Sequence, residues 1–212
     1  MRYLLFFLPA LLLAAQTPAA HRKAPANKAL AAVTVAKNFK ESGSPTAPIR
    51  MEIYTDYECP ACRDLYMNIL PPLTADFVAT GKVQILHRDF RIPSHQFSKV
   101  ATRYANAAGM IGKFDIVVNQ LFVTQPEWAQ TGNVDGTVAK VLSPADMEKV
   151  RAIVKGDSHL DDSVVKDEAM ATNVDHLQET PTLVIISKGK RETITRVPYA
   201  VLKQYLNQKL AQ

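Results

Sequence analysis

The sequence predicts an α/β domain with a set of helices inserted into it, and three observations lead to this prediction. A β-branched and aromatic stretch at 49–56 precedes Cys59-Pro60-Ala61-Cys62, which is followed by apolar residues at helical spacing. Thr180-Pro181 stands directly before a strongly apolar stretch that reads as a strand. The chain between these two segments has helical spacing of its apolar residues. We therefore expect two parts of one α/β unit with helices between them.

The first twenty residues have the composition of a secretory signal peptide. Arg2 is followed by a run of mostly apolar residues and then by small ones. The apolar run is shorter than the roughly twenty residues that cross a bilayer, and Pro9 disfavours a membrane helix. An uncleaved membrane anchor is the alternative, because the cleavage site is indistinct. We expect residues 1–20 to be removed and the mature protein to be exported, to a periplasmic or other extracytoplasmic space.

Residues 21–48 are expected to form a basic, solvated linker, with at most a short strand at 33–36. The net charge of the chain is +5, residues 21–50 alone carry +5, and residues from 51 onward sum to −1. Nucleic-acid binding would need a basic face on the folded body, which this distribution does not supply. We expect no nucleic-acid partner, and we expect the folded domain to begin at Ile49.

The two cysteines of the chain, Cys59 and Cys62, have a spacing that points to redox chemistry. Random placement would put two cysteines three positions apart roughly one time in a hundred. A disulfide that closes so short a loop adds little stability, so the pair is poorly suited as a staple and well suited to thiol–disulfide exchange. An exported protein meets an oxidising compartment in which such a pair can be used.

The neighbours of the two cysteines predict different roles for them. Pro60 suits the first turn of a helix, which places Cys59 at the helix N-terminus, where free N–H groups and the dipole favour a thiolate. Lowering a thiol pKa from about 8.5 to about 6 raises the thiolate fraction at pH 7 from about 3% to about 90%. Cys59 is the expected nucleophile and Cys62 the shielded resolving thiol. Glu58 is expected to be a solvated loop acid, with modulation of Cys59 as the alternative.

Metal binding is the rival interpretation of two neighbouring thiols. A closed zinc site needs two further ligands, usually a Cys/His pair at short spacing, and the five histidines form no such pair. A soft copper(I) site would have to draw on dispersed methionines. We expect no metal and no other cofactor.

Helical spacing and helix-start residues predict the elements after Phe90. Ser143 and Pro144 form a good helix start, with Ser143 as the cap. The expected helices are 96–111, 114–123, a stretch around 137–142, 144–154 and 163–173. A strand at 182–187, a tight turn at 188–190, a strand at 191–196 and a closing amphipathic helix at 198–210 are expected to follow.

Taken together, these residues resemble the DsbA-like branch of the thioredoxin superfamily, whose members are exported thiol–disulfide oxidoreductases. The resemblance covers roughly residues 43–210 and is carried by Ala47-Pro48-Ile49, Ile53 through Cys62, His87 through Phe90, and Thr180 through Val184. It implies a thioredoxin-like fold with an inserted helical subdomain. Residues 49–92 would form the first half of the fold, 93–176 the helical insertion, and 177–212 the second half.

The resemblance also implies a substrate site and partners. Pro181 would be cis and face the cysteine pair, and the backbone of Thr180 would pair with an extended substrate segment beside Cys59. The clients would be cysteine-containing exported proteins, and a membrane redox partner would recycle the pair. Disulfide donation is the simplest activity. The alternatives are a reductase or isomerase using the same pair, a non-catalytic peptide-binding module and a metal chaperone. Isomerases dimerise through a separate domain, for which residues 21–48 are too short, so we expect a monomer.

Two positions depart from the relatives. Relatives commonly carry a buried acid six residues before the first cysteine, where this chain has Ile53. The acid here is Glu52, and a shift of one residue in a strand moves a side chain to the opposite face. Either another group serves Cys62, or the strand carries a bulge. Ala61 stands where strong oxidants have a histidine, which predicts a reduction potential between those of DsbA and thioredoxin.

Overall fold

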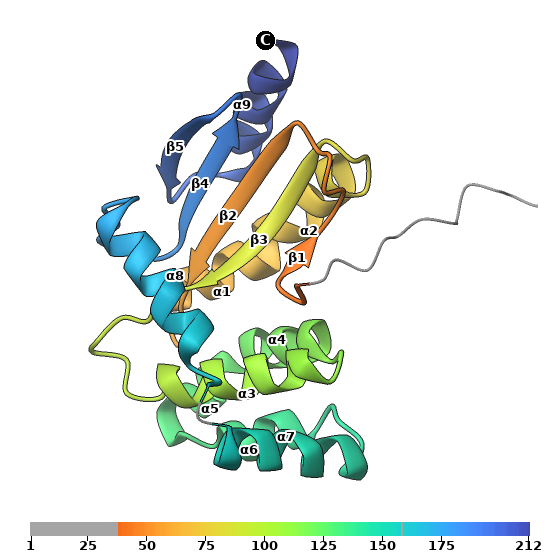
Figure 1. Ribbon diagram of the computed structural model, residues 1–212, viewed down its shortest axis with the longest axis vertical. Coiled ribbons are helices and arrows are strands. Elements are labelled where there is room, and N and C mark those ends of the chain that lie inside the picture. The colour runs from red at the N-terminus through yellow and green to blue at the C-terminus, as the bar shows by residue number, and fades with distance from the viewer. Residues whose placement is uncertain (1–37, 158) are drawn as a thin grey trace, which may run out of the picture. The chain divides into compact units, whose positions relative to one another are not determined.

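The computed structural model describes residues 38–157 and 159–212, so the predicted signal peptide at 1–20 and the predicted strand at 33–36 lie outside the described residues. A sheet with the strand order β1-β3-β2-β4-β5 carries the fold (Figure 1). Its strands are β1 (Glu41–Ser42), β2 (Ile49–Thr55), β3 (Val83–Asp89), β4 (Thr182–Ser187) and β5 (Lys190–Thr195). Strands β2 and β3 run parallel, and the other neighbouring strands pair antiparallel.

The central strand, β2, is covered on both faces, so that even Glu52 and Thr55 are buried in it. Met51 and Ile53 face one helical layer, whereas Glu52 and Tyr54 face the other side of the sheet. The pairing of β2 runs without interruption along both β3 and β4, so the strand carries no bulge. Glu52 therefore points away from the face that Ile53 occupies, and the bulge alternative is excluded.

One face of the sheet is covered by the helix that begins at the cysteine pair, together with the closing helix α9 (Tyr199–Ala211) (Figure 1). The first of these helices is longer than expected: α1 (Pro60–Asp64), η1 (Leu65–Ile69), α2 (Leu70–Leu73) and η2 (Thr74–Val78) follow one another. Pro71 and Pro72 lack an N–H, and a π-turn accommodates them, with the N–H of Leu70 donating to the carbonyl of Leu65. The proline pair thus shifts the helical register without ending the helix.

The helices between β3 and β4 fall into two parts. A group with its own hydrophobic core comprises α3 (Ser98–Met110), α4 (Phe114–Val123), α5 (Gln125–Thr131), α6 (Val134–Ala139) and α7 (Pro144–Gly156). Helix α8 (Asp162–Asn173) instead covers the second face of the sheet through Ala171. The expected insertion at 93–176 is therefore a subdomain of five helices plus a helix that belongs to the sheet layer. Helix α5 was not expected, and α6 begins earlier than the predicted stretch around 137–142.

The folded part starts before Ile49, contrary to the predicted linker boundary at residue 48. Strand β1 pairs with β3, and the ring of Phe39 packs on Phe114 with 5.3 Å between ring centroids. Phe39 lies so close to α3 that a Cβ on Gly109 would come within 2.3 Å of its ring. The basic residues of this stretch are thus not all solvated, because Lys40 is only 4% exposed.

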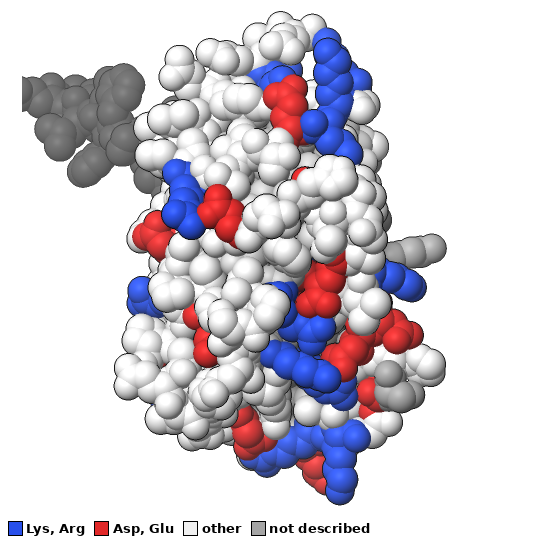
Figure 2. Space-filling view, turned by 90° about the vertical axis from the view of Figure 1, so that its left-hand side faces the viewer, with Lys and Arg blue, Asp and Glu red and all other residues white. Residues whose placement is uncertain are grey.

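Lys40 belongs to a network of ion pairs that joins the start of the fold to β3 and α8. Its ammonium lies 2.6 Å from Asp89 and 3.2 Å from Asp167, and Arg88 also pairs with Asp167 at 2.8 Å. Burial lowers the pKa of Lys40, but the two carboxylates outweigh burial and raise it, so the lysine is charged. Elsewhere on the surface, basic and acidic side chains lie interspersed over the face shown in Figure 2.

None of the helices in the described residues combines the length and the apolar character that crossing a membrane requires.

Candidate active site

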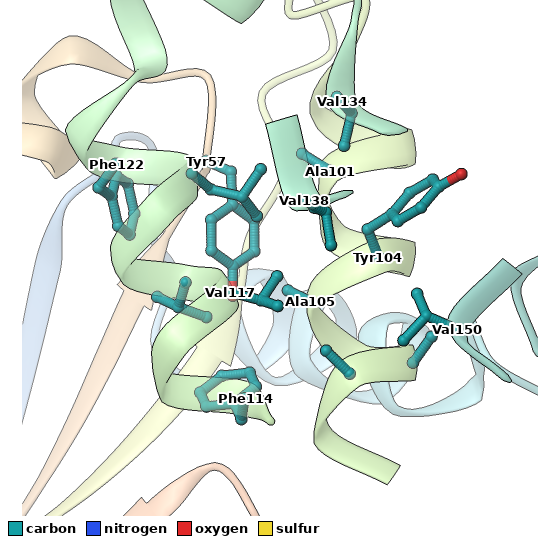
Figure 3. Close-up of a cluster of buried hydrophobic side chains, with 14 of the residues drawn as sticks. Tyr57, Ala101, Tyr104, Ala105, Phe114, Val117, Phe122, Val134, Val138 and Val150 are labelled. Carbon is teal, nitrogen blue, oxygen red and sulfur yellow. The ribbon is translucent and has the colours of Figure 1, made fainter. Parts of the chain in front are cut away.

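The two cysteines lie where β2 ends and α1 begins, against the core of the helical subdomain. Cys59 is the N-cap of α1, and Pro60 is its first residue, as expected from the sequence. Both cysteines are free thiols, Cys59 being 8% exposed and Cys62 fully buried. Tyr57, just before the pair, inserts between α3 and α4, with its ring 5.3 Å from that of Phe122 (Figure 3). The helical subdomain thus shields one side of the pair.

The surroundings of Cys59 lower its pKa to about 5. The hydrogen bond with the thiol of Cys62 is the largest cause. Burial opposes it, and the side chain of Thr180 and the backbone N–H groups of Cys62 and Ala61 add further stabilisation of the thiolate. The backbone groups belong to the first turn of α1, where N–H groups lack helical partners. At pH 7 a thiol with this pKa is about 99% thiolate.

Cys62 has the opposite character. Burial raises its pKa well above the ordinary value for a thiol, and the hydrogen bond and charge of Cys59 raise it further. The backbone N–H of Asp56 donates to its sulfur over 3.4 Å and acts in the lowering direction. The pair therefore combines a thiol of lowered pKa with a shielded thiol of raised pKa.

Thr180 and Pro181 lie opposite Cys59, and the peptide bond between them is cis. In its protonated form, the thiol of Cys59 donates to the carbonyl of Thr180 over 3.5 Å. The hydroxyl of Thr180 is buried and has no hydrogen-bond partner among the described residues, although its side chain lowers the pKa of both cysteines. It is therefore a donor available to a thiolate.

We expect Thr180→Val to raise the pKa of Cys59 from about 5 to about 6. A hydrogen bond to a charged group contributes roughly 1.5 kcal/mol, which corresponds to about one pKa unit. The measurement is the thiolate absorbance at 240 nm as a function of pH. The fold should not be destabilised, because valine buries no unpaired hydroxyl. An unchanged pKa would mean that the hydroxyl does not reach the thiolate.

A cavity of about 320 Å³ opens beside the pair. It lies between the start of the active-site helix, the Thr180-Pro181 turn and the segment before α9. Its lining is mostly apolar, with one acid and one base at its edge: Ala61, Asp64, Leu65, Ile69, Pro181, Leu183, Arg196, Val197 and Pro198. Ala61 and Pro181 connect this cavity to the cysteines. It can accommodate an apolar side chain of an extended peptide.

The two acids before the pair are arranged differently from the expectation. The carboxylate of Asp56 is fully buried and binds groups on the β3–α3 segment. The carboxylate of Glu58 accepts from the backbone N–H of Phe97 over 2.7 Å, so it is not a solvated loop acid. Both side chains fasten the loop before Cys59 to the helical subdomain.

Two further residues that sequence reasoning missed hold the same loop. The buried side chain of Gln125 donates to the carbonyls of Tyr57 and Cys59 over 2.7 and 2.9 Å. The guanidinium of Arg63 donates to the carbonyl of Phe122 over 2.9 Å. Neither residue stands in a recognisable pattern with the cysteines, and only the unexpected helix α5 brings Gln125 to them.

The described residues contain no group of three or more His, Cys, Asp or Glu side chains that could hold a metal ion.

Comparison with known proteins places this site in a family. The family model described as thioredoxin matches residues 36–206. The probable disulfide bond formation protein D of Bacillus cereus and that of Bacillus anthracis are each 35% identical to this chain over 48 residues. The matched part is 23% of this chain and 22% of each relative, so the match spans less than a quarter of the curated relatives.

Solved structures share the fold over most of the chain. α-DsbA1 of Wolbachia pipientis superposes with a TM-score of 0.70 at 17% identity, covering 81% of this chain and 90% of the other. BdbD of Bacillus subtilis, in its oxidised form, gives a TM-score of 0.68 at 21% identity, covering 82% and 93%. DsbA2 of Pseudomonas aeruginosa gives 0.64 at 20% identity, covering 81% and 93%. The predicted thioredoxin-like fold with inserted helices is confirmed: the chain belongs to the thioredoxin family and has the fold of its DsbA members.

Proposed function

We propose that this protein is an exported thiol–disulfide oxidoreductase that donates the disulfide of Cys59 and Cys62 to cysteine-containing exported proteins. One observation carries the proposal: a thiolate and a buried thiol lie three residues apart at a helix start, against Thr180-Pro181. A stabilised thiolate favours the reduced form of the pair, and a pair that is stable when reduced is a good disulfide donor. The family and the disulfide bond formation protein D relatives support this chemistry.

The reaction begins with the oxidised pair. A substrate thiolate attacks the sulfur of Cys59, a substrate–Cys59 disulfide forms, and the Cys59–Cys62 bond breaks. Its electron pair leaves with Cys62, which takes up a proton. A second substrate thiolate then attacks the substrate sulfur of the mixed disulfide, and Cys59 departs as the thiolate that its surroundings favour. The substrate has lost two electrons and the cysteine pair has gained them.

Substrate would bind beside Cys59 in an extended conformation. We assign the backbone of Thr180 as the pairing partner and the 320 Å³ cavity as the site for one apolar side chain. Pro181 forms part of the cavity wall and keeps the substrate segment next to the pair. Pro60 and Ala61 act on Cys59 by forming the first turn of α1. Glu58 acts only through the position of the loop that it fastens to Phe97.

Export and recycling complete the proposal. The apolar leader at 1–20 would direct the chain out of the cytoplasm, to a periplasmic or similar space. The reduced pair would pass its two electrons to a membrane redox partner, and the protein would act as a monomer. Ala61 provides no histidine for the thiolate, so we expect a weaker oxidant than DsbA.

The direction of electron flow is tested by equilibrating the mature protein with glutathione. A reduction potential between about −120 and −180 mV would support a disulfide donor, whereas about −270 mV would identify a reductase. A pair that cannot be cycled would contradict the proposal and leave a peptide-binding or metal-chaperone role.

Cys62→Ser is expected to accumulate mixed disulfides with client proteins, because Cys59 can still attack client disulfides, the reverse of donation, and the thiol that would displace the client from Cys59 is absent. The adducts would be captured from the exported fraction under non-reducing conditions and identified by mass spectrometry. Cys59→Ser is the matched control and should capture none, because Cys62 is fully buried. Equal capture by the two variants would contradict the assignment of Cys59 as the residue that forms the mixed disulfide.

A further inference from the structure

The buried thiol Cys62 needs a group that stabilises its thiolate when the disulfide is opened. Ile53 stands where relatives commonly carry a buried acid, and it packs in the apolar core. Glu52 faces the other side of the sheet and pairs with Arg88 and Arg191, both at 2.9 Å. Neither Ile53 nor Glu52 therefore supplies a polar group to the sulfur of Cys62.

Asp56, the first residue after β2, contacts the sulfur through its backbone. Its N–H lies 3.4 Å from the sulfur of Cys62, and its carbonyl accepts from the N–H of Cys59 over 3.2 Å. The same residue therefore holds both cysteines through main-chain groups. A hydrogen bond donated to a thiolate stabilises it, and such a bond is stronger in a site without water.

The side chain of Asp56 fixes the direction of that N–H. Its carboxylate has no solvent exposure and meets four hydrogen-bonding groups. They are the N–H groups of Glu58 (2.8 Å) and Ile92 (2.6 Å), the hydroxyl of Ser98 (2.6 Å) and Nδ1 of His95 (3.0 Å). Ile92 and His95 lie between β3 and α3, and Ser98 is the first residue of α3. Through these three residues, the carboxylate of Asp56 links the loop before the cysteines to the start of the helical subdomain.

The four partners also explain why a buried carboxylate is tolerated so close to a reacting sulfur. An ionised carboxylate accepts several hydrogen bonds at once, and these partners disperse its charge. The carboxylate of Asp56 points toward Ile92 and Ser98, whereas its backbone N–H points toward the sulfur of Cys62. The backbone bond lowers the pKa of Cys62 and so opposes the effect of burial.

We propose that Asp56 is the positioning residue for Cys62, acting through its backbone N–H, and that Ser98 and His95 hold it in place through its carboxylate. The inference rests on the proposed function, because it concerns the step in which Cys62 leaves the disulfide. A leaving thiolate that is better stabilised departs faster. Ser98 and His95 thereby affect the reactivity of Cys62 through Asp56, without a hydrogen bond of their own to its sulfur.

Variants of the two side-chain donors test this without altering Asp56. Ser98→Ala and His95→Ala each remove one donor, while His95→Asn retains a side-chain amide close to the position of Nδ1. His159→Ala is the matched control, because His159 also places Nδ1 3.0 Å from an aspartate, Asp162, on an exposed part of the protein. All are made in the full mature chain with both cysteines.

Two rates are measured for each variant. One is the rate at which glutathione opens the oxidised pair, which depends on Cys62 as the leaving group. The other is the rate at which iodoacetamide alkylates the reduced protein, which depends on Cys59. We expect Ser98→Ala and His95→Ala to slow opening about fivefold, with alkylation unchanged within about twofold. His95→Asn should recover most of the rate, and His159→Ala should match the wild type.

A merely structural role would lower the melting temperature and leave the opening rate unchanged, and this result would overturn the inference. Equal slowing of both rates would also overturn it, because the effect would then not be specific to Cys62. Failure of the proposed function looks different, since the wild-type pair would then not be opened by glutathione at all. In that case the thiolate absorbance of Cys62 at 240 nm, followed against pH in Cys59→Ser, decides: Ser98→Ala should shift its midpoint upward, and an unshifted midpoint refutes the role of Asp56.

Discussion

Alkylation of native, reduced protein by iodoacetamide is expected to modify Cys59 alone, with a half-maximal rate near pH 5. At pH 6 a thiol with this pKa is about 90% thiolate, whereas an ordinary thiol is about 0.3% thiolate, a difference of about 300-fold. A thiolate of low pKa is also a weaker nucleophile, so the pH midpoint is more diagnostic than the absolute rate. Cys62 should remain unmodified, because burial and a raised pKa both protect it.

Substitutions at Cys62 provide matched controls for this profile. The thiol of Cys62 is the largest single cause of the lowered pKa of Cys59. Cys62→Ser keeps a hydrogen-bond donor and should preserve most of the shift, whereas Cys62→Ala should move the midpoint clearly upward. A midpoint near pH 8.5 in the wild type, or the same midpoint in both variants, would contradict the assigned cause.

The same pKa makes the stability of the reduced form depend on pH. The pKa of Cys59 falls from an ordinary value of 9.0 to about 5 on folding. The resulting stabilisation is fully present above the unfolded pKa and is lost as pH falls through about 5. The oxidised form has no thiol and lacks this contribution. Urea unfolding should therefore show the stability of the reduced form gaining on the oxidised form between pH 5 and pH 9, by up to about 1.4 kcal/mol per pH unit.

Lys40→Met is expected to destabilise the fold by about 3–5 kcal/mol. The substitution leaves Asp89 and Asp167 buried next to one another without the ammonium that contacts both. For a domain of this size the melting temperature should fall by about 10 °C. Urea unfolding and thermal melting followed by circular dichroism would measure the loss. The result would also establish that the folded domain begins before Ile49.

Lys149→Met is the matched control for Lys40. Lys149 also pairs with an aspartate, Asp146, but its side chain is 62% exposed. Exposed ion pairs contribute little, so this variant should stay within about 0.5 kcal/mol of the wild type. If Lys40→Met were equally mild, the network of Lys40 would not stabilise the fold, and residues before Ile49 would contribute little to it.

The features that could be predicted from the sequence depend on neighbouring residues. Pro60 at the first helical position places Cys59 at the start of helix α1. Cys62, three positions later, therefore lies about one turn further along the same helix. The β-branched and aromatic stretch of β2 and the Thr180-Pro181 turn before β4 also have local signals. Helix α5 was missed because it is short, and β1 was missed because its two residues become a strand only by pairing with β3.

The groups that surround the cysteines depend instead on residues far apart in the chain. Ser98 reaches Asp56 across 42 positions, and Gln125 reaches Cys59 across 66. No local feature of the sequence indicates which way the carboxylate of Asp56 points. The fold turns that carboxylate toward the helical subdomain and leaves the backbone N–H facing Cys62.

The sequence by itself determined the α/β class, the inserted helices and the spacing of the cysteine pair, and it predicts Cys59 as the nucleophile. Each of these follows from short-range rules: hydrophobic periodicity, a proline at a helix start, and the spacing of two thiols. Only the tertiary structure decided where the folded domain begins, which way Asp56 points and which residues hold Cys62. Those outcomes depend on burial and hydrogen bonding between distant segments, because a buried charge such as Lys40 or Asp56 is stable only where the fold brings its partners to it.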